Sequence, residues 1–460
     1  MFKKLIGDKQ FYKRVFSLMI PIMVQNGIMQ FVNMLDNIMV GQVGTLEMSG
    51  VAVANQLIFV FNLCIFGVVS GAGIFGAQFV GSGDEEGVRY TFRYKNIVCV
   101  LITLLCIGLF ICFGESLIGL YLQGEGKPED IQATLTFGKE YLNIMLIGLI
   151  PVAIVQSYSS TLRETGNATI PMIAGIIAVL VNLVLNYVLI FGNFGAPQLG
   201  IQGAAIATVI SRFVELAFIA LWTNAHKDEN SFIKGAYKSL YIPIKLVGRI
   251  SAKGVPLMLN ETMWAAGMAL LAQSYSLRGL DVVAANNISN TFFNVFSVAF
   301  LAVGASIGVI LGQTLGAGKV EEAKATSYKL IFFSFCISTL IGLIYFFAAM
   351  LIPFAYNTTD EIRVLAMRLM QISALVMPLD ALANATYFTM RSGGKAFLTF
   401  LFDSCYVWIV VLPVAFGIGL GTSIPILPMF AICNLASGIK GLAGLVLVRS
   451  GIWAKNIVEK

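Results

Sequence analysis

The sequence predicts an all-α polytopic membrane protein with twelve transmembrane helices in two six-helix lobes, related by a pseudo-twofold axis along the membrane normal. Three observations support this fold class. First, 58% of the 460 residues are hydrophobic and 12% are charged, whereas about a quarter of the residues in a soluble protein are charged. Second, long apolar segments recur along the chain. Third, the second half of the sequence repeats the first at a nearly constant offset.

Twelve apolar segments are long enough to cross a bilayer, because a transmembrane helix needs roughly 20 apolar residues. Several exceed this minimum, which implies that they are tilted or that their ends project beyond the hydrocarbon. The predicted spans are residues 15–41, 50–80, 93–114, 136–159, 169–192, 201–223, 254–277, 284–313, 327–350, 364–389, 397–420 and 427–449.

The repeat has an offset of 235 residues over the first two spans of each half. It aligns Pro21 with Pro256, Gly44 with Gly279, Asn55 with Asn290, Gln78 with Gln313 and Gly81 with Gly316. Further on, TLRETGNA (161–168) recurs as TMRSGGKA (389–396). Six crossings per copy make the two halves parallel repeats. We therefore expect an N-lobe at 1–223, an inter-lobe loop at 224–253 and a C-lobe at 254–460.

Lysine and arginine residues are distributed unevenly between alternate loops, with 23 on one side of the membrane and 5 on the other. Positively charged loops remain on the cytoplasmic side, so both termini and the loop 224–253 should face the cytoplasm, in the cell (inner) membrane. No removable signal peptide is apparent at the start of the sequence. The same asymmetry explains the net charge of +6, and nucleic-acid binding is not expected.

The cysteine and histidine residues do not form the clusters that a catalytic or metal centre requires. The single histidine is His226, in the central polar loop. The cysteines form no CxxC pair and read as small buried hydrophobic residues. We expect no enzyme activity, no cofactor and no metal beyond a transported Na+. The seven cysteines, all in apolar runs, are Cys64, Cys99, Cys106, Cys112, Cys336, Cys405 and Cys433.

Polar residues inside the N-lobe spans point to a cation site, because charged groups in hydrocarbon are costly and are functional candidates by default. Asn182 and Asn186 are four residues apart and share one helix face. Asp36 and Thr208 are expected at a similar depth. One carboxylate, two amides and a hydroxyl can bind a small cation or load a proton. Alternatively, the two asparagines hold helices together by hydrogen bonds.

The C-lobe spans carry three acids and one lysine: Glu261, Asp380, Asp403 and Lys440. One lysine cannot neutralise three carboxylates, so we expect at least one acid to be protonated or cation-bound when the site is closed. Asp403 and Lys440 either belong to this network or simply pair with each other near the cytoplasmic end. Arg212 and Glu215, three residues apart in the sixth span, read as an ion pair within one helix.

In several motifs the chain resembles the multidrug and toxic compound extrusion (MATE) transporters, in their bacterial NorM-like branch. The resemblance covers essentially the full length and implies twelve helices in two lobes, alternating access, and export of organic cations and drugs. It also implies that Asp36, Asn182, Asn186 and Thr208 form the N-lobe cation site, with Glu261 and Asp380 as the C-lobe acidic pair. Some relatives have Asp in place of Asn186. The motifs are DNIMVGQVG (36–44), GAQFVGSGD (76–84), TLRETGN (161–167), GAAIAT (203–208), GQTLGAG (312–318), PLDAL (378–382) and RSGGK (391–395).

These observations predict a secondary antiporter, functional as a monomer in the lipid bilayer, that exports cationic drugs and xenobiotics in exchange for inward Na+ or H+. Sodium is preferred because neutral oxygens accompany Asp36. One alternative is a lipid-linked sugar or lipid flippase of the same superfamily. Such a flippase would line its cavity with arginines, and Arg212 reads as the only intramembrane arginine. A membrane enzyme or receptor is a further alternative, but no convergent nucleophile, base or metal set is visible.

Overall fold

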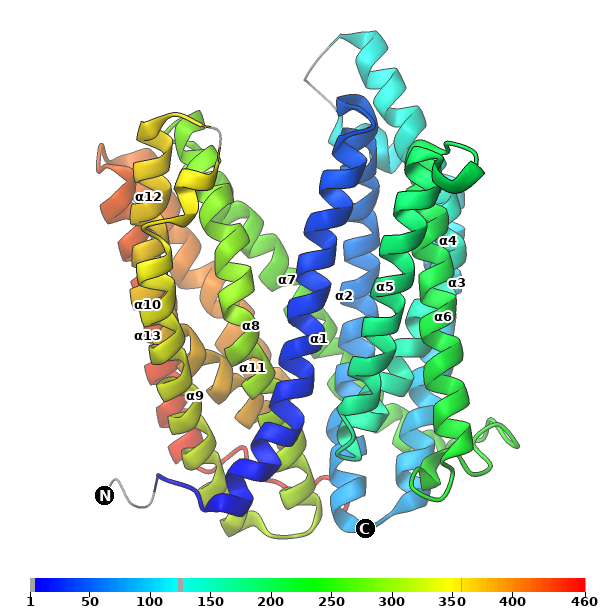
Figure 1. Cartoon of the computed structure of the whole chain (residues 1–460). Coiled ribbons are helices and arrows are strands. Elements are labelled where there is room, and N and C mark those ends of the chain that lie inside the picture. The colour runs from blue at the N-terminus through cyan, green and yellow to red at the C-terminus, as the bar shows by residue number, and fades with distance from the viewer. Residues whose placement is uncertain (1–4, 123–126, 357, 460) are drawn as a thin grey trace. The chain divides into compact units, whose positions relative to one another are not determined.

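The computed structural model describes residues 5–122, 127–356 and 358–459, and within these ranges the regular structure is entirely helical (Figure 1). Within these residues, twelve spans are long and apolar enough to cross a membrane, which confirms the predicted number. They are α1 Lys9–Gly41, α2 Thr45–Ser82, α3 Glu85–Tyr121, α4 Pro128–Glu164, α5 Thr169–Phe191, α6 Gly200–Ala225, α7 Ile244–Ser276, α8 Leu280–Gly316, α9 Val320–Ala348, α10 Asp360–Ser392, the composite span 396–421 and α13 Ile426–Arg449.

Most helices extend further than predicted, in several cases by more than one turn. For example, α3 begins at Glu85 and α4 at Pro128, both well before the predicted starts of these spans. A hydropathy window detects only the part of a helix that lies in hydrocarbon, whereas the helix continues into the polar interface. Acidic residues in the first turn of α3 and α4 favour this continuation, because they compensate the positive end of the helix dipole.

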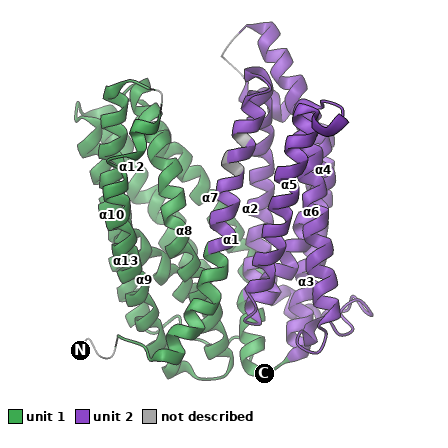
Figure 2. Cartoon of the chain, viewed as in Figure 1, with its two compact units in different colours: residues 1–23, 74–84, 252–460 green, residues 24–73, 85–251 purple. Residues whose placement is uncertain are grey.

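The chain divides into two compact units (Figure 2). Unit 2 comprises residues 24–73 and 85–251, and unit 1 comprises residues 1–23, 74–84 and 252–460. In unit 2, α6 packs against α4 and α5, and α3 packs against α4. In unit 1, α10 packs against α8, α9 and α13, around buried residues that include Tyr345, Met370 and Phe430. The units provide two separate cores, and each core positions its own set of intramembrane polar residues.

Within unit 1, the end of α2 crosses the end of α8 through residues that correspond to each other in the sequence repeat. A Cβ atom added at Gly81 would overlap the backbone carbonyl of Gln313, and one added at Gly316 would overlap that of Gln78. Gly81 lies near Gln78 in sequence and contacts Gln313, which is the counterpart of Gln78 in the repeat. Gly316 lies near Gln313 in sequence and contacts Gln78 in the same way. Such reciprocity is typical of a contact between symmetry-related elements, and small residues permit the close approach of membrane helices.

This crossing leads to a stability prediction. We expect Gly81→Ala and Gly316→Ala each to destabilise the protein by about 1–3 kcal/mol, because the added methyl group must displace backbone atoms. Gly108→Ala is the matched control, since nothing lies within 4 Å of a Cβ at that helical position. Thermal unfolding of the purified proteins in detergent measures the effect. Equal melting temperatures for all three variants would show that the crossing tolerates a side chain.

Candidate functional site

In unit 2, the four residues predicted for the N-lobe site come together in one hydrogen-bonded chain. Asn186 Nδ2 donates to Asp36 Oδ1 over 2.7 Å and also lies 3.2 Å from Asn182 Oδ1. Asn182 Nδ2 in turn donates to Thr208 Oγ1 over 3.2 Å. Helices α1, α5 and α6 each contribute to this chain. The i,i+4 spacing of the asparagines on α5 places both amides on the face that meets Asp36 and Thr208.

The Asp36 carboxylate fixes the orientation of the neighbouring amide. Asn186 is 1% exposed, and its Nδ2 must face the acceptor oxygen of Asp36, so its Oδ1 points elsewhere. That Oδ1 atom is buried and has no hydrogen-bond partner among the described residues. A buried acceptor without a donor needs an explanation. Beside a carboxylate, this oxygen is suited to coordinate a small cation or to accept a hydrogen bond from a protonated group.

Unit 2 also contains a cavity of about 380 Å³ between α1, α2, α4 and α6. Thr208, at the end of the hydrogen-bonded chain that starts at Asp36, is part of its wall. Its charged lining residues are Arg163, Arg212 and Glu215. Arg212 Nη1 lies 2.9 Å from Glu215 Oε2, which confirms the predicted ion pair within α6.

The cavity has a second arginine in its wall. Arg163, in the last turn of α4, lines the same cavity as Arg212. Arg391, its counterpart in the repeat, lies within the span Asp360–Ser392 and is 9% exposed. Both arginines come at the very end of their helices, in motifs that look like loop sequence, so hydropathy alone assigned them to the aqueous side.

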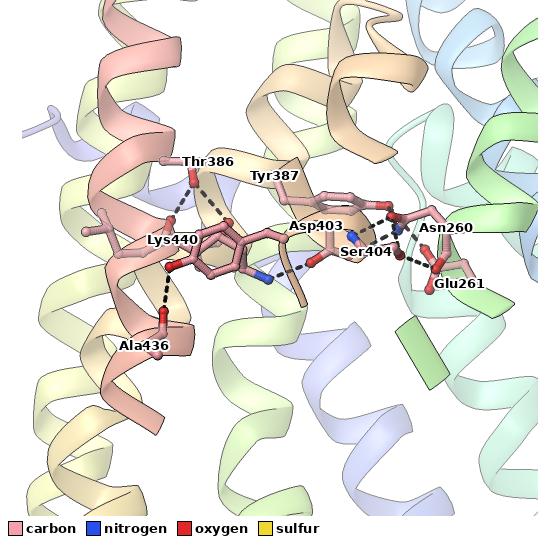
Figure 3. Close-up of polar contacts among 11 residues, drawn as sticks. Asn260, Glu261, Thr386, Tyr387, Asp403, Ser404, Ala436 and Lys440 are labelled. Atoms are coloured by element: carbon pink, nitrogen blue, oxygen red, sulfur yellow. Dashed lines mark hydrogen bonds and ion pairs between the residues drawn. The ribbon is translucent and has the colours of Figure 1, made fainter. Parts of the chain in front are cut away.

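In unit 1, three of the four predicted polar residues belong to one network (Figure 3). Lys440 Nζ lies 2.6 Å from Asp403 Oδ1, and Asn260 Nδ2 donates to Asp403 Oδ2 over 3.0 Å. Figure 3 shows Asn260 and Tyr387 between Asp403 and Glu261. Tyr387 Oη donates to Glu261 Oε1 over 3.1 Å. The sequence leaves open whether Asp403 and Lys440 pair with each other or belong to a network with Glu261. In the structure they pair with each other and also belong to that network.

Asp380 is separate from this network. It lies on α10, seven residues before Tyr387, and no described residue provides it with a hydrogen bond or an ion pair. The structure therefore does not bring Glu261 and Asp380 together through a shared contact. Lys440 interacts electrostatically with Asp380, but its short contact is with Asp403. Of the three predicted acids in unit 1, Asp380 is the one without a hydrogen bond or ion pair among the described residues.

The segment that carries Asp403 departs from a regular α-helix. Within the composite span, α11 (Ala396–Phe400) leads into the π-helical turns η5 (Leu401–Cys405) and η6 (Val407–Val411) before α12 (Leu412–Gly421). Ser404 Oγ bonds to both the backbone oxygen and the side-chain oxygen of Asn260. This contact ties the π-helical turn to α7. Wide turns of this kind occur frequently at functional sites, and this one positions Asp403 against Lys440.

Neutral residues of the unit 1 network were missed by the sequence reasoning. Asn260 and Ser404 are fully buried, and Tyr387 is 7% exposed. Single uncharged polar residues are common in membrane helices, where they join helices by hydrogen bonds. Only the position of Asn260 directly before Glu261 offered a signal, and that signal was weak.

Unit 2 also holds a buried ion pair that the sequence reasoning missed. Lys95 Nζ lies 2.6 Å from Glu164 Oε1, and the two side chains are 0% and 5% exposed. Lys95 also bonds to Ser160 and Thr161 at 3.1 Å. Lys95 lies in the first turn of the predicted span 93–114, and the count of basic residues groups it with the preceding loop, whereas α3 begins at Glu85.

Comparison with known proteins identifies the family of this chain. The MatE family model matches residues 21–188 and 256–417. The chain belongs to the MatE family. The two matches begin 235 residues apart, which is the offset of the repeat found in the sequence. This MatE protein is thus a member of a transporter family and not of an enzyme family, in agreement with the resemblance that its motifs indicated.

Relatives are similar over nearly the whole chain. The probable multidrug resistance protein NorM of Thermotoga maritima is 26% identical over 410 residues, covering 88% of this chain and 85% of the relative. The probable multidrug resistance protein YoeA of Bacillus subtilis is 26% identical over 414 residues, covering 89% and 87% of the two chains.

Solved structures share the fold. A crystal structure of MATE in complex with MaD3S has a TM-score of 0.86 at 18% identity, covering 97% of both chains. A mutant of the Vibrio cholerae MATE transporter VcmN has a TM-score of 0.85 at 19% identity, covering 97% of this chain and 98% of the other. The MatE chain therefore has the predicted all-α fold of twelve transmembrane helices in two six-helix lobes.

Proposed function

We propose that this MatE protein is a secondary active multidrug efflux antiporter that exports organic cations and drugs in exchange for inward Na+ or H+, by alternating access. The family and the names of its relatives support the multidrug efflux activity. The observation that supports the coupling is the chain from Asp36 through Asn186 and Asn182 to Thr208, in which one buried amide oxygen has no hydrogen-bond partner among the residues that the structure describes. Asp36 is bonded to the neutral Asn186, so its carboxylate can take up a small cation or a proton without breaking an ion pair.

Coupling requires that the cation and the drug prefer different conformations of the transporter. A cation bound at Asp36 neutralises the charge beside the cavity that Thr208 lines, which makes that cavity less attractive to a second cation. By thermodynamic linkage, bound drug weakens cation binding by the same factor. In unit 1, Asp380 and Glu261 are proposed as a second cation site, because Lys440 already compensates Asp403.

The setting proposed for this transport is the cell (inner) membrane, with both termini in the cytoplasm and the monomer as the functional unit. The excess of basic residues in one set of loops supports the orientation. In this orientation, a single protein chain carries drugs out of the cell and cations into it. The two lobes are proposed to be residues 1–223 and 254–460, joined by the loop 224–253.

The test uses purified protein in proteoliposomes. We expect a fluorescent organic cation to be transported when a Na+ gradient is imposed, with weaker or no transport under a pH gradient alone, since Asn182, Asn186 and Thr208 bring neutral oxygens into the hydrogen-bonded chain of Asp36. Transport under the pH gradient and none under the Na+ gradient would assign the coupling to protons. Absence of transport under both gradients, with correctly inserted protein, would contradict the antiporter proposal.

A further inference from the structure

A small apolar cluster in unit 1 brings four distant parts of the chain together. Ile74, Leu257 and Ala396 form its buried centre, and Ile457 packs against them. These residues belong to α2, to α7, to α11 and to segment 450–459, which follows α13. Packing at this cluster therefore fixes segment 450–459 against three helices.

One buried glutamine holds the same segment by its backbone. Gln78 Nε2 donates to the backbone oxygen of Lys455 over 3.1 Å, and the backbone N–H of Ile457 donates to Gln78 Oε1 over 2.7 Å. Gln78 is fully buried, and so is Trp453, earlier in the segment. Segment 450–459 therefore has a defined position, and its side chains can contribute to a binding site.

Three lysines lie beside the apolar cluster in the sequence, and we call them the lysine cluster. Lys253 lies one helical turn before the α7 member, Lys395 directly precedes the α11 member, and Lys455 lies two residues before the member from segment 450–459. Lys395 and Lys455 both act electrostatically on Lys253. Among the described residues, none of the three ammonium groups has an ion pair or a hydrogen bond.

Positive charges that are held close together repel each other, and the repulsion grows where water is partly excluded. Lys253 and Lys395 are partly buried, and Lys455 is exposed. An anion that binds between the lysines relieves this repulsion and forms charge-assisted hydrogen bonds. Phosphate fits this arrangement, because lysine binds phosphate as a point charge and basic pockets between membrane helices bind lipid headgroups.

The surroundings of the lysine cluster favour a lipid over a soluble phosphate. Lys253 directly precedes the predicted apolar span 254–277, and Lys395 lies two residues before the start of the next-to-last predicted span. Exposed apolar side chains follow on both helices, among them Val255, Leu259 and Phe397. A phospholipid can place its phosphate at the lysines and its acyl chains along such side chains, whereas a soluble phosphate uses only the lysines.

We propose that Lys253, Lys395 and Lys455 bind the phosphate of an anionic phospholipid such as phosphatidylglycerol. The bound headgroup bridges α7, the start of α11 and segment 450–459, and so holds that segment in place. None of the residues proposed for cation or drug binding takes part. The inference therefore does not depend on the transported compound or on the coupling ion.

The test is native mass spectrometry of the purified full-length protein, titrated in a neutral detergent with dioleoyl phosphatidylglycerol or dioleoyl phosphatidylcholine. The two lipids share their acyl chains and differ in net charge. We expect the wild type to bind its first phosphatidylglycerol about tenfold more tightly than phosphatidylcholine. Lys253→Gln combined with Lys395→Gln should weaken phosphatidylglycerol binding about tenfold and change phosphatidylcholine binding less than about twofold. Arginine at both positions should keep the preference, because it retains the charge.

The matched control combines Lys319→Gln with Lys324→Gln. It removes the same number of positive charges from unit 1, but these lysines have carboxylate partners, Glu322 at 3.3 Å and Glu321 at 2.7 Å. A lysine that is already paired gains less from a lipid phosphate. The control should therefore leave the binding of both lipids unchanged.

Equal affinity of the wild type for the two lipids would overturn the inference, and so would equal weakening in the control and in the lysine-cluster variant. Displacement of phosphatidylglycerol by an equal concentration of glycerol phosphate would also overturn it, since the site would then recognise a soluble phosphate. If the double variant does not fold, Lys455→Gln decides, because this side chain is exposed and only its backbone is bonded. It should weaken phosphatidylglycerol binding about threefold or more, and unchanged binding would refute the site.

Discussion

Asp36→Asn and Asp380→Asn are each expected to reduce drug export to the level of cells without the transporter, while the amount of folded protein in the membrane stays normal. Asparagine keeps the size of the side chain but cannot take up a proton and provides no net charge for a cation. Neither change breaks an ion pair, because Asp36 is bonded to the neutral Asn186 and Asp380 has no hydrogen bond or ion pair among the described residues. The measurement is dye accumulation in whole cells, with protein quantified from the same membranes.

Two controls separate coupling from folding. Asp228→Asn removes a carboxylate that is 99% exposed and pairs with Lys234, so export should be unchanged. Asp403→Asn should instead lower the amount of folded protein, because it leaves Lys440, which is 9% exposed, without its carboxylate. Full export by Asp380→Asn would remove Asp380 from the proposed coupling site, and full export by a variant neutralised at Asp36, Glu261 and Asp380 would refute cation coupling through acids altogether.

The sequence was sufficient to predict those contacts of the site that follow from helix geometry. Asn182 and Asn186 share a face because they are four residues apart, and depth along the predicted spans placed Asp36 and Thr208 beside them. The structure confirms these contacts. The repeat predicted equivalent positions in both halves, and the reciprocal contacts of Gly81 with Gln313 and of Gly316 with Gln78 agree with that alignment.

What the sequence did not reveal depends on where helices end and on which neutral residues face each other. Lys95 lies in the first turn of one predicted span and Arg163 just beyond the end of another, where a basic residue is normally solvated. Only the lengths of α3 and α4 place them inside the protein. Asn260 and Tyr387 are uncharged, so nothing in one sequence distinguishes them from ordinary helix contacts. The π-helical turns around Asp403 likewise have no proline or glycine that would mark them.

The second large effect is expected on stability. Lys95→Leu should destabilise unit 2 by about 3–5 kcal/mol, because it removes the ammonium group that lies 2.6 Å from the buried carboxylate of Glu164. Lys139→Leu is the control: Lys139 also pairs with a glutamate at 2.6 Å, but that pair is half exposed, so its loss should cost at most about 1 kcal/mol. Thermal unfolding of the purified proteins in detergent measures both effects. Similar melting temperatures for the two variants would mean that the buried pair contributes no more than an exposed one.

The sequence repeat indicates a second substitution that should restore the stability lost in Lys95→Leu. The counterpart of Lys95 in the second half is Leu330, which is 0% exposed, and the counterpart of Glu164 is Ser392, which is 3% exposed. The second half therefore fills the same two helix positions without any charge. Combining Lys95→Leu with Glu164→Ser copies that arrangement and should recover most of the lost stability, since replacing both members of a buried pair is often neutral or stabilising. A double variant as unstable as the single one would show that the pair is required by packing specific to the first half, and not only by the need to compensate a buried carboxylate.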